Sequence, residues 1–149
     1  KAQQRFDDAD AAYQESLQLR LALADEFPLE TAWQGLLILS YEAIKDLATA
    51  RDDAIGATRA QREAARIWDA LRVEAPEPST EIAWFDSQLL LVELLLIQRD
   101  EPTLAAEANE LLTRLSDYAQ QHTQTLQSRP DLLKELARLR DRASTKGTR

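Results

Sequence analysis

The sequence predicts an all-α protein in which antiparallel helical hairpins stack as a short α-solenoid, with five long helices and a C-terminal capping helix. The 149 residues are rich in strong helix formers and contain only 3 Gly and 5 Pro, so long uninterrupted helices are expected. Apolar residues recur three or four positions apart, which is the spacing of one helix face. No stretch alternates apolar and polar residues like a strand, and no Asn-Gly or Asp-Gly hairpin turn occurs.

The first two helices are expected over residues 6–26 and 30–50. Pro28 separates them, because the residue before a proline disfavours the helical region. In each, apolar residues three or four positions apart form one stripe along the helix. The stripe residues are Ala9, Ala12, Tyr13, Leu17, Leu19 and Leu23 in the first helix, and Trp33, Leu36, Leu37, Tyr41, Ile44 and Leu47 in the second.

The third helix is expected over residues 54–74, after a break at Arg51. Asp52 or Asp53 offers the N-cap, since a short carboxylate side chain accepts from the free N–H groups of a first helical turn. The helix ends at the segment 75–78, Ala-Pro-Glu-Pro, which is the strongest breaker in the chain.

The fourth helix is expected over residues 81–99, with Ser79 or Thr80 as its cap. Its centre, from Leu89 to Ile97, is apolar on nearly every side, and such a helix must be covered on all sides. We interpret it as the central helix of the fold. The alternative is a self-associating bundle that forms a homodimer through this helix.

The fifth helix is expected over residues 102–121, opening on a proline that suits the first turn. A shorter helix after Pro130 ends the fold, and the tail 144–149 is expected to be disordered. A single domain therefore covers residues 1–143. The chain begins at Lys1 and holds no Met, so we expect it to be part of a longer or processed protein.

An internal repeat relates the first helix to the third. A shift of 48 residues places Leu19 on Ile67 and Pro28 on Pro76. The two helices share a pattern of three residues: a small one, a larger one four positions later, and another small one three positions after that. It occurs at Ala9, Tyr13 and Ser16, and again at Ala57, Gln61 and Ala64.

This spacing resembles the second helix of a tetratricopeptide repeat (TPR). The period of 48 residues exceeds the family period of about 34, so the helices are longer. The Pro-bounded, long-helix style is similar to repeat regions in large bacterial signalling proteins. The resemblance implies a scaffold module that binds a peptide or helix of a partner protein.

The composition argues against several other classes of function. The chain has no Cys and a single His, His122, so we expect no enzyme activity, no metal site and no cofactor. No apolar run reaches the roughly 20 residues of a membrane span. The absence of Cys fits a cytoplasmic protein, although an extracytoplasmic domain of a membrane-anchored protein is the alternative.

The charge distribution also bears on the partner. The net charge is −8; residues 129–149 hold seven basic and three acidic residues, a net of +4, so the remainder carries −12. An acidic body repels phosphate backbones, so we do not expect nucleic-acid binding.

The TPR resemblance also implies the partner-binding residues, because the first helix of each hairpin lines the concave surface in that family. The candidates are Leu39, Glu42, Asp46 and Thr49, followed by Leu90, Glu93, Leu94 and Ile97. Acidic and aliphatic side chains at these positions favour a protein or peptide partner of basic or apolar character. For Glu93 the alternative is a position at the edge, where the carboxylate reaches water.

Four aromatic residues are expected in the core because they follow helical spacing, with a platform for a ligand as the alternative. They are Trp33, Trp68, Trp84 and Phe85.

Overall fold

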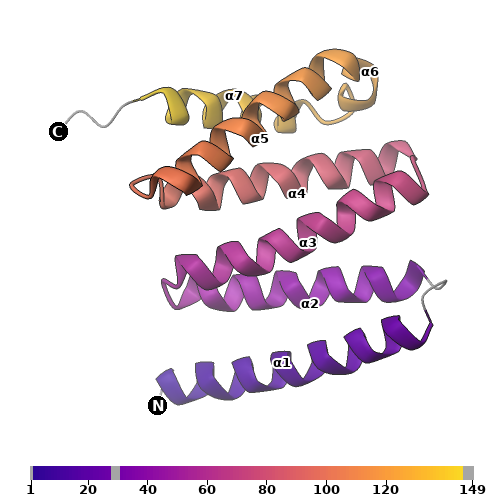
Figure 1. The fold of residues 1–149 in the computed structure, drawn as a ribbon, viewed down its shortest axis with the longest axis vertical. Coiled ribbons are helices and arrows are strands. Elements are labelled where there is room, and N and C mark those ends of the chain that lie inside the picture. The colour runs from indigo at the N-terminus through magenta and orange to yellow at the C-terminus, as the bar shows by residue number, and fades with distance from the viewer. Residues whose placement is uncertain (1, 28–30, 146–149) are drawn as a thin grey trace. The chain divides into compact units, whose positions relative to one another are not determined.

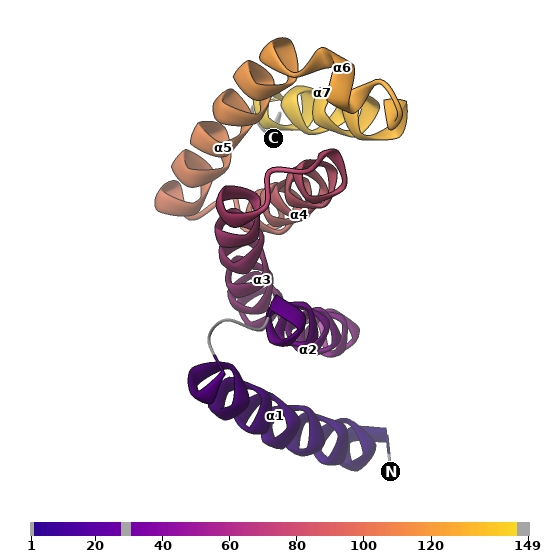
Figure 2. The ribbon, with the colours of Figure 1, turned by 90° about the vertical axis from the view of Figure 1, so that its right-hand side faces the viewer.

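The computed structural model describes residues 2–27 and 31–145, and this part of the chain contains helices and no strands (Figures 1 and 2). The all-α prediction is therefore confirmed. The helices are α1 (Ala2–Glu26), α2 (Thr31–Ala50), α3 (Ala54–Glu74), α4 (Pro78–Ile97), α5 (Pro102–Gln121), α6 (Thr123–Leu126) and α7 (Pro130–Ser144).

The chain divides into two compact units, Lys1–Ile67 and Trp68–Arg149, and the division falls within α3. A repeat array can divide in this way without forming separate domains, because each helix contacts mainly its neighbours. The single domain predicted over residues 1–143 therefore stays a prediction. Of the tail expected at 144–149, Ser144 is the last residue of α7. Residues 146–149 lie outside the described residues, as does Pro28.

In the first unit, α1 and α2 pack against each other as an antiparallel hairpin (Figure 1). Leu17, Leu37 and Ile38 are at most 7% exposed. Arg20 of α1 crosses the hairpin, where its Nη1 donates to the carbonyl of Leu36 at 2.8 Å and to the Ser40 hydroxyl at 2.6 Å. Arg20 therefore links α1 to α2 through hydrogen bonds to two uncharged acceptors.

The turn between α2 and α3 is held by the two aspartates that follow Arg51. Asp52 takes a left-handed φ of 57°, which ends α2, and the N–H of Asp53 donates to the carbonyl of Ala48 at 2.9 Å. The Asp53 side chain then caps α3, because its Oδ1 accepts from the N–H of Gly56 at 2.9 Å. The predicted N-cap is confirmed at Asp53.

The start of α4 differs from the expectation. The helix begins at Pro78 rather than at residue 81, and Glu77 is the capping residue, without a side-chain hydrogen bond. The caps predicted at Ser79 and Thr80 are therefore wrong. Proline has no N–H to satisfy and its fixed φ suits the first turn, so the second proline of the breaker opens the helix.

In the second unit, α4 packs against α5, α6 and α7 (Figure 2). Most of the apolar run of α4 is core, with exposed fractions of at most 4% at Leu89, Leu91, Val92, Leu95 and Leu96. The short helix α6 was not predicted. It follows His122, whose φ of −117° and ψ of 37° end α5, and it buries Leu126.

Candidate functional site

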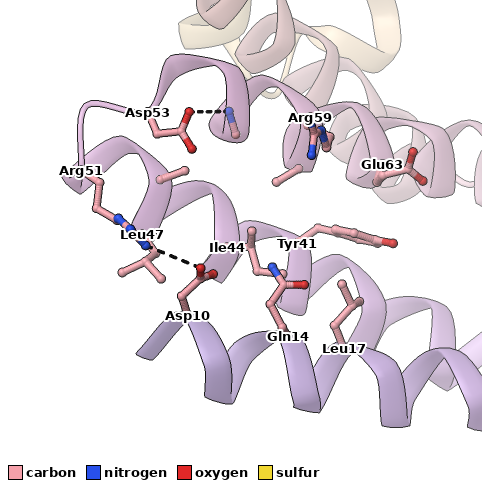
Figure 3. Close-up of a pocket in the computed structure, with 13 residues that line it drawn as sticks. Asp10, Gln14, Leu17, Tyr41, Ile44, Leu47, Arg51, Asp53, Arg59 and Glu63 are labelled. Carbon is pink, nitrogen blue, oxygen red and sulfur yellow. Dashed lines mark hydrogen bonds and ion pairs between the residues drawn. The ribbon is translucent and has the colours of Figure 1, made fainter. Parts of the chain in front are cut away.

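A cavity of about 460 Å³ lies in the first unit, between α1, α2 and the first turns of α3 (Figure 3). Side chains from all three helices converge on it. The lining residues are Asp10, Gln14 and Leu17 of α1; Tyr41, Ile44, Leu47 and Ala48 of α2; Arg51 and Asp53 of the turn; and Gly56, Arg59, Ala60 and Glu63 of α3.

The floor of the cavity is apolar. Leu17, Ala48 and Ala60 are buried, and Ile44 and Leu47 are half-buried. On α2, Ile44, Leu47 and Ala48 are three or four positions apart, which is why they lie on the side of that helix that faces the cavity. The small side chains at 48 and 60 leave the space that larger residues would fill, so the cavity follows from the sequence at those two positions.

At one end of the cavity, the charged side chains already have partners within the unit. The Nη2 of Arg51 lies 3.2 Å from an oxygen of Asp7, and its Nη1 lies 3.5 Å from an oxygen of Asp10. The carboxylate of Asp53 serves as the cap of α3. The ion pairs join the turn to α1, so the charges at this end of the cavity are already paired.

At the other end, Tyr41, Arg59 and Glu63 face the cavity (Figure 3). Burial raises the pKa of the Tyr41 hydroxyl; the Glu63 carboxylate raises it further, against the opposing effect of Arg66. The hydroxyl is therefore protonated at neutral pH and able to donate. Glu63 is 3.2 Å from Arg66, whereas Arg59 forms no ion pair with any residue that the structure describes.

Chemically, the cavity offers an apolar floor and a rim of hydrogen-bonding groups. Gln14 donates and accepts, Tyr41 does both, and Arg59 donates. Such a surface suits an apolar side chain together with the backbone polar groups beside it. Among the described residues, no three or more His, Cys, Asp or Glu side chains are grouped so that they could hold a metal ion.

The predicted residues on α2 lie away from this cavity. Leu39 is 57% exposed, Asp46 is exposed with its carboxylate 3.0 Å from Lys45, and Thr49 donates to the carbonyl of Lys45. Glu42 is half-buried. At about 100° per residue these four share one face of α2, and the cavity residues of α2 share the opposite face.

The predicted residues on α4 belong to the second unit. Leu90 is 38% and Ile97 55% exposed, and Leu94 is half-buried. Glu93 contacts its own chain, since its Oε1 accepts from Nη2 of Arg138 at 2.8 Å and lies 4.0 Å from Arg142.

The cavity is not predicted from the sequence, although several of the residues that line it belong to the predicted helical stripes. Tyr41, Ile44 and Leu47 belong to the stripe predicted for the second helix; they are half-buried and line the cavity. The small size of Ala48 and Ala60, which line the cavity with these larger residues, was the available signal.

No protein-family model, no curated protein and no solved structure matches this chain. Separately, no helix in residues 2–27 and 31–145 combines the length and the apolar character needed to cross a membrane.

The aromatic residues of α4 form a core cluster in the second unit, so the core prediction is confirmed for Trp84 and Phe85, which are 4% and 0% exposed. The Trp84 and Tyr118 rings meet edge to face at 4.8 Å, and His122 stacks on Tyr118 at 4.1 Å. Burial raises the pKa of Tyr118, as does the nearby Glu81 carboxylate. Trp33 and Trp68 are half-buried.

Proposed function

We propose that the chain is a non-catalytic interaction module that binds a peptide or helix of a partner protein through the cavity of the first unit. It would act as a scaffold within a larger regulatory or signalling protein in the cytoplasm, without a cofactor. The observation that carries the proposal is the cavity itself, with its apolar floor between three helices and its polar rim.

The dimensions and chemistry of the cavity favour a peptide. Its volume of about 460 Å³ falls in the range in which ligands are usually held. Leu17, Ile44 and Leu47 would take an apolar side chain, while Gln14 and Arg59 would bond the adjoining peptide groups.

The charges around the cavity agree with a partner of basic or apolar character. Its lining holds three carboxylates, from Asp10, Asp53 and Glu63, against two guanidinium groups. The net charge of the lining is therefore −1, which does not favour a nucleic acid.

The resemblance to tetratricopeptide repeats supports the same proposal. Two of the small positions that carry it, Ala57 and Ala64, are each 1% exposed, as expected where helices approach closely. The corresponding residue Gln61 is also buried, whereas Tyr13 is 40% exposed. In that family such hairpins commonly bind segments of other proteins.

Selection of peptides displayed on phage against the purified chain, followed by calorimetry, tests the proposal. Gln14 is exposed and lines the cavity, so Gln14→Trp should block it without disturbing the fold. Gln18→Trp is the matched control, since Gln18 is exposed on the same helix and lies outside the cavity. We expect the first variant to abolish binding and the second to keep it. Failure to enrich any peptide, or equal binding by both variants, would overturn the proposal.

Self-association through residues 81–99 remains the second candidate. Its support is narrow, because the exposed large apolar side chains of α4 are Leu90 and Ile97. Size-exclusion chromatography with light scattering decides between the two. A monomer at all accessible concentrations would exclude the homodimer and leave the peptide-binding proposal standing.

A further inference from the structure

A line of acidic and apolar residues runs along one exposed side of α1. Its members are spaced four and three positions apart, so they share one helix face. All are exposed, and Leu19, at their centre, is 63% exposed. These residues, here called the α1 seam, are Asp8, Ala12, Glu15, Leu19, Ala22 and Glu26.

The seam borders an apolar groove between α1 and α2. The groove has a volume of about 420 Å³, and Leu19 and Leu23 of α1 line it together with Trp33 and Leu36 of α2. Helices bind in such grooves by inserting apolar residues three or four positions apart. Around Leu19, the apolar residues Ala22 and Leu23 follow at three and four positions, which suits a helix lying along α1.

The charge of α1 defines the occupant. Its 25 residues include six acidic and two basic ones, a net of −4. Arg20 also lines the groove, but its Nη1 donates to Leu36 and Ser40 of α2. Asp7 and Asp10 are paired with Arg51. The seam carboxylates Asp8, Glu15 and Glu26 form no ion pair with any residue in the described part of the chain. They are therefore available to cations of another molecule.

We propose that the α1 seam and its groove bind a basic amphipathic helix of a partner protein. Apolar side chains of that helix would enter between Leu19, Leu23 and Trp33, and its lysine or arginine side chains would face Asp8, Glu15 and Glu26. A second copy of the chain is a poor occupant, because its own seam is equally acidic. An anionic membrane is disfavoured for the same reason. This surface is separate from the cavity of the proposed function.

The probe for this site is a labelled synthetic helix with leucines at alternating three- and four-residue spacing, flanked by lysines. The matched peptide carries glutamate in place of every lysine. We expect fluorescence anisotropy to show binding of the lysine peptide alone, with affinity that falls as salt is added. Leu19→Asp should weaken binding by about tenfold or more, since it removes the central apolar contact and desolvates a charge. Ile55→Asp is the control, because Ile55 is 67% exposed on α3.

Charge reversal makes the test specific. Glu15→Lys with Glu26→Lys should lose the lysine peptide and gain the glutamate peptide, with unchanged helicity by circular dichroism. Equal binding of both peptides by the native chain, or no effect of Leu19→Asp, would overturn the proposal. The proposal would also be overturned if the native chain formed a dimer, or bound anionic phosphatidylserine vesicles, and Leu19→Asp abolished that association. Gln14→Trp should leave the lysine peptide bound, so the two proposals fail independently.

Discussion

The guanidinium carbon of Arg72 lies 4.2 Å from the centroid of the Trp84 ring. The same indole donates its N–H to Asp69 at 2.6 Å. Asp69 and Arg72 both lie in the last turns of α3. Arg72 is also 5.8 Å from the Tyr118 ring, and its Nε is buried with no acceptor among the residues that the structure describes. Attraction to the aromatic faces therefore holds this cation in the second unit.

Replacement of Arg72 tests this contact. We expect Arg72→Ala to lower the free energy of unfolding by about 1–2 kcal/mol, because it removes both the cation–π attraction and the packed stem of the side chain. Arg72→Met keeps most of the stem and should recover about half of the loss. Urea unfolding followed by tryptophan fluorescence measures both. Arg66→Ala is the control, since the Arg66 side chain is 79% exposed; an equal loss there would contradict the prediction.

Asp53 and Gly56 are coupled at the start of α3. Asp53→Ala should destabilise the chain by about 1 kcal/mol, the usual loss when an N-cap side chain is removed. A Cβ added at Gly56 would collide with the Asp53 carboxylate, so Gly56→Ala should displace the cap and forfeit the normal gain of alanine in a helix.

A double-mutant cycle measures this coupling by chemical denaturation. In the Asp53→Ala background the obstruction is gone, so Gly56→Ala should then stabilise by about 0.5–1 kcal/mol. Additive effects of the two substitutions would show that the carboxylate moves aside at no cost.

Acid should weaken the second unit through Glu135. The hydrogen bond from Arg138 lowers the pKa of Glu135, and this effect outweighs burial, which raises the pKa. A carboxyl with a depressed folded-state pKa stabilises the fold above its unfolded pKa of about 4.3. That contribution is lost as the pH falls through the lower folded-state value.

Arg138→Ala removes the first cause of the shift, so its urea midpoint should decline less steeply than the native one between about pH 4.5 and pH 3. At neutral pH the variant should be modestly less stable, because the Arg138 contact with Glu93 is also lost. Arg140→Ala on the same helix is the control. Parallel pH profiles of the native chain and Arg138→Ala would rule out this linkage.

Much of the fold could be predicted because prolines and aspartates punctuate the chain. The cap at Asp53 and the helix start at Pro102 depend on local backbone preferences, which can be read directly from the sequence. The start of α4 was misplaced because Pro78 can either break or open a helix. The short helix α6 was missed because its four residues are too few to show a helical repeat of apolar positions.

The candidate site was less accessible from sequence. Periodicity assigned Tyr41 and Ile44 to an inward face, but a cavity depends on how three helices meet, which periodicity does not state. The contact between Arg51 and Asp10 joins residues 41 positions apart, and no local pattern announces it. The same holds for Glu93, whose partners lie on α7.

The exposed face of α2 provides the last prediction, because it separates the groove implied by the TPR resemblance from the cavity. If partners bind the groove, replacing Glu42 and Asp46 together with lysine should abolish binding of a selected peptide while helicity by circular dichroism stays unchanged. Both residues lie on the side of α2 opposite Ile44, so a peptide held in the cavity should keep its affinity in this variant. Calorimetry with the double variant and with Gln14→Trp therefore gives opposite results for the two sites. Loss of binding in the α2 variant alone would move the binding surface to Leu39, Glu42, Asp46 and Thr49.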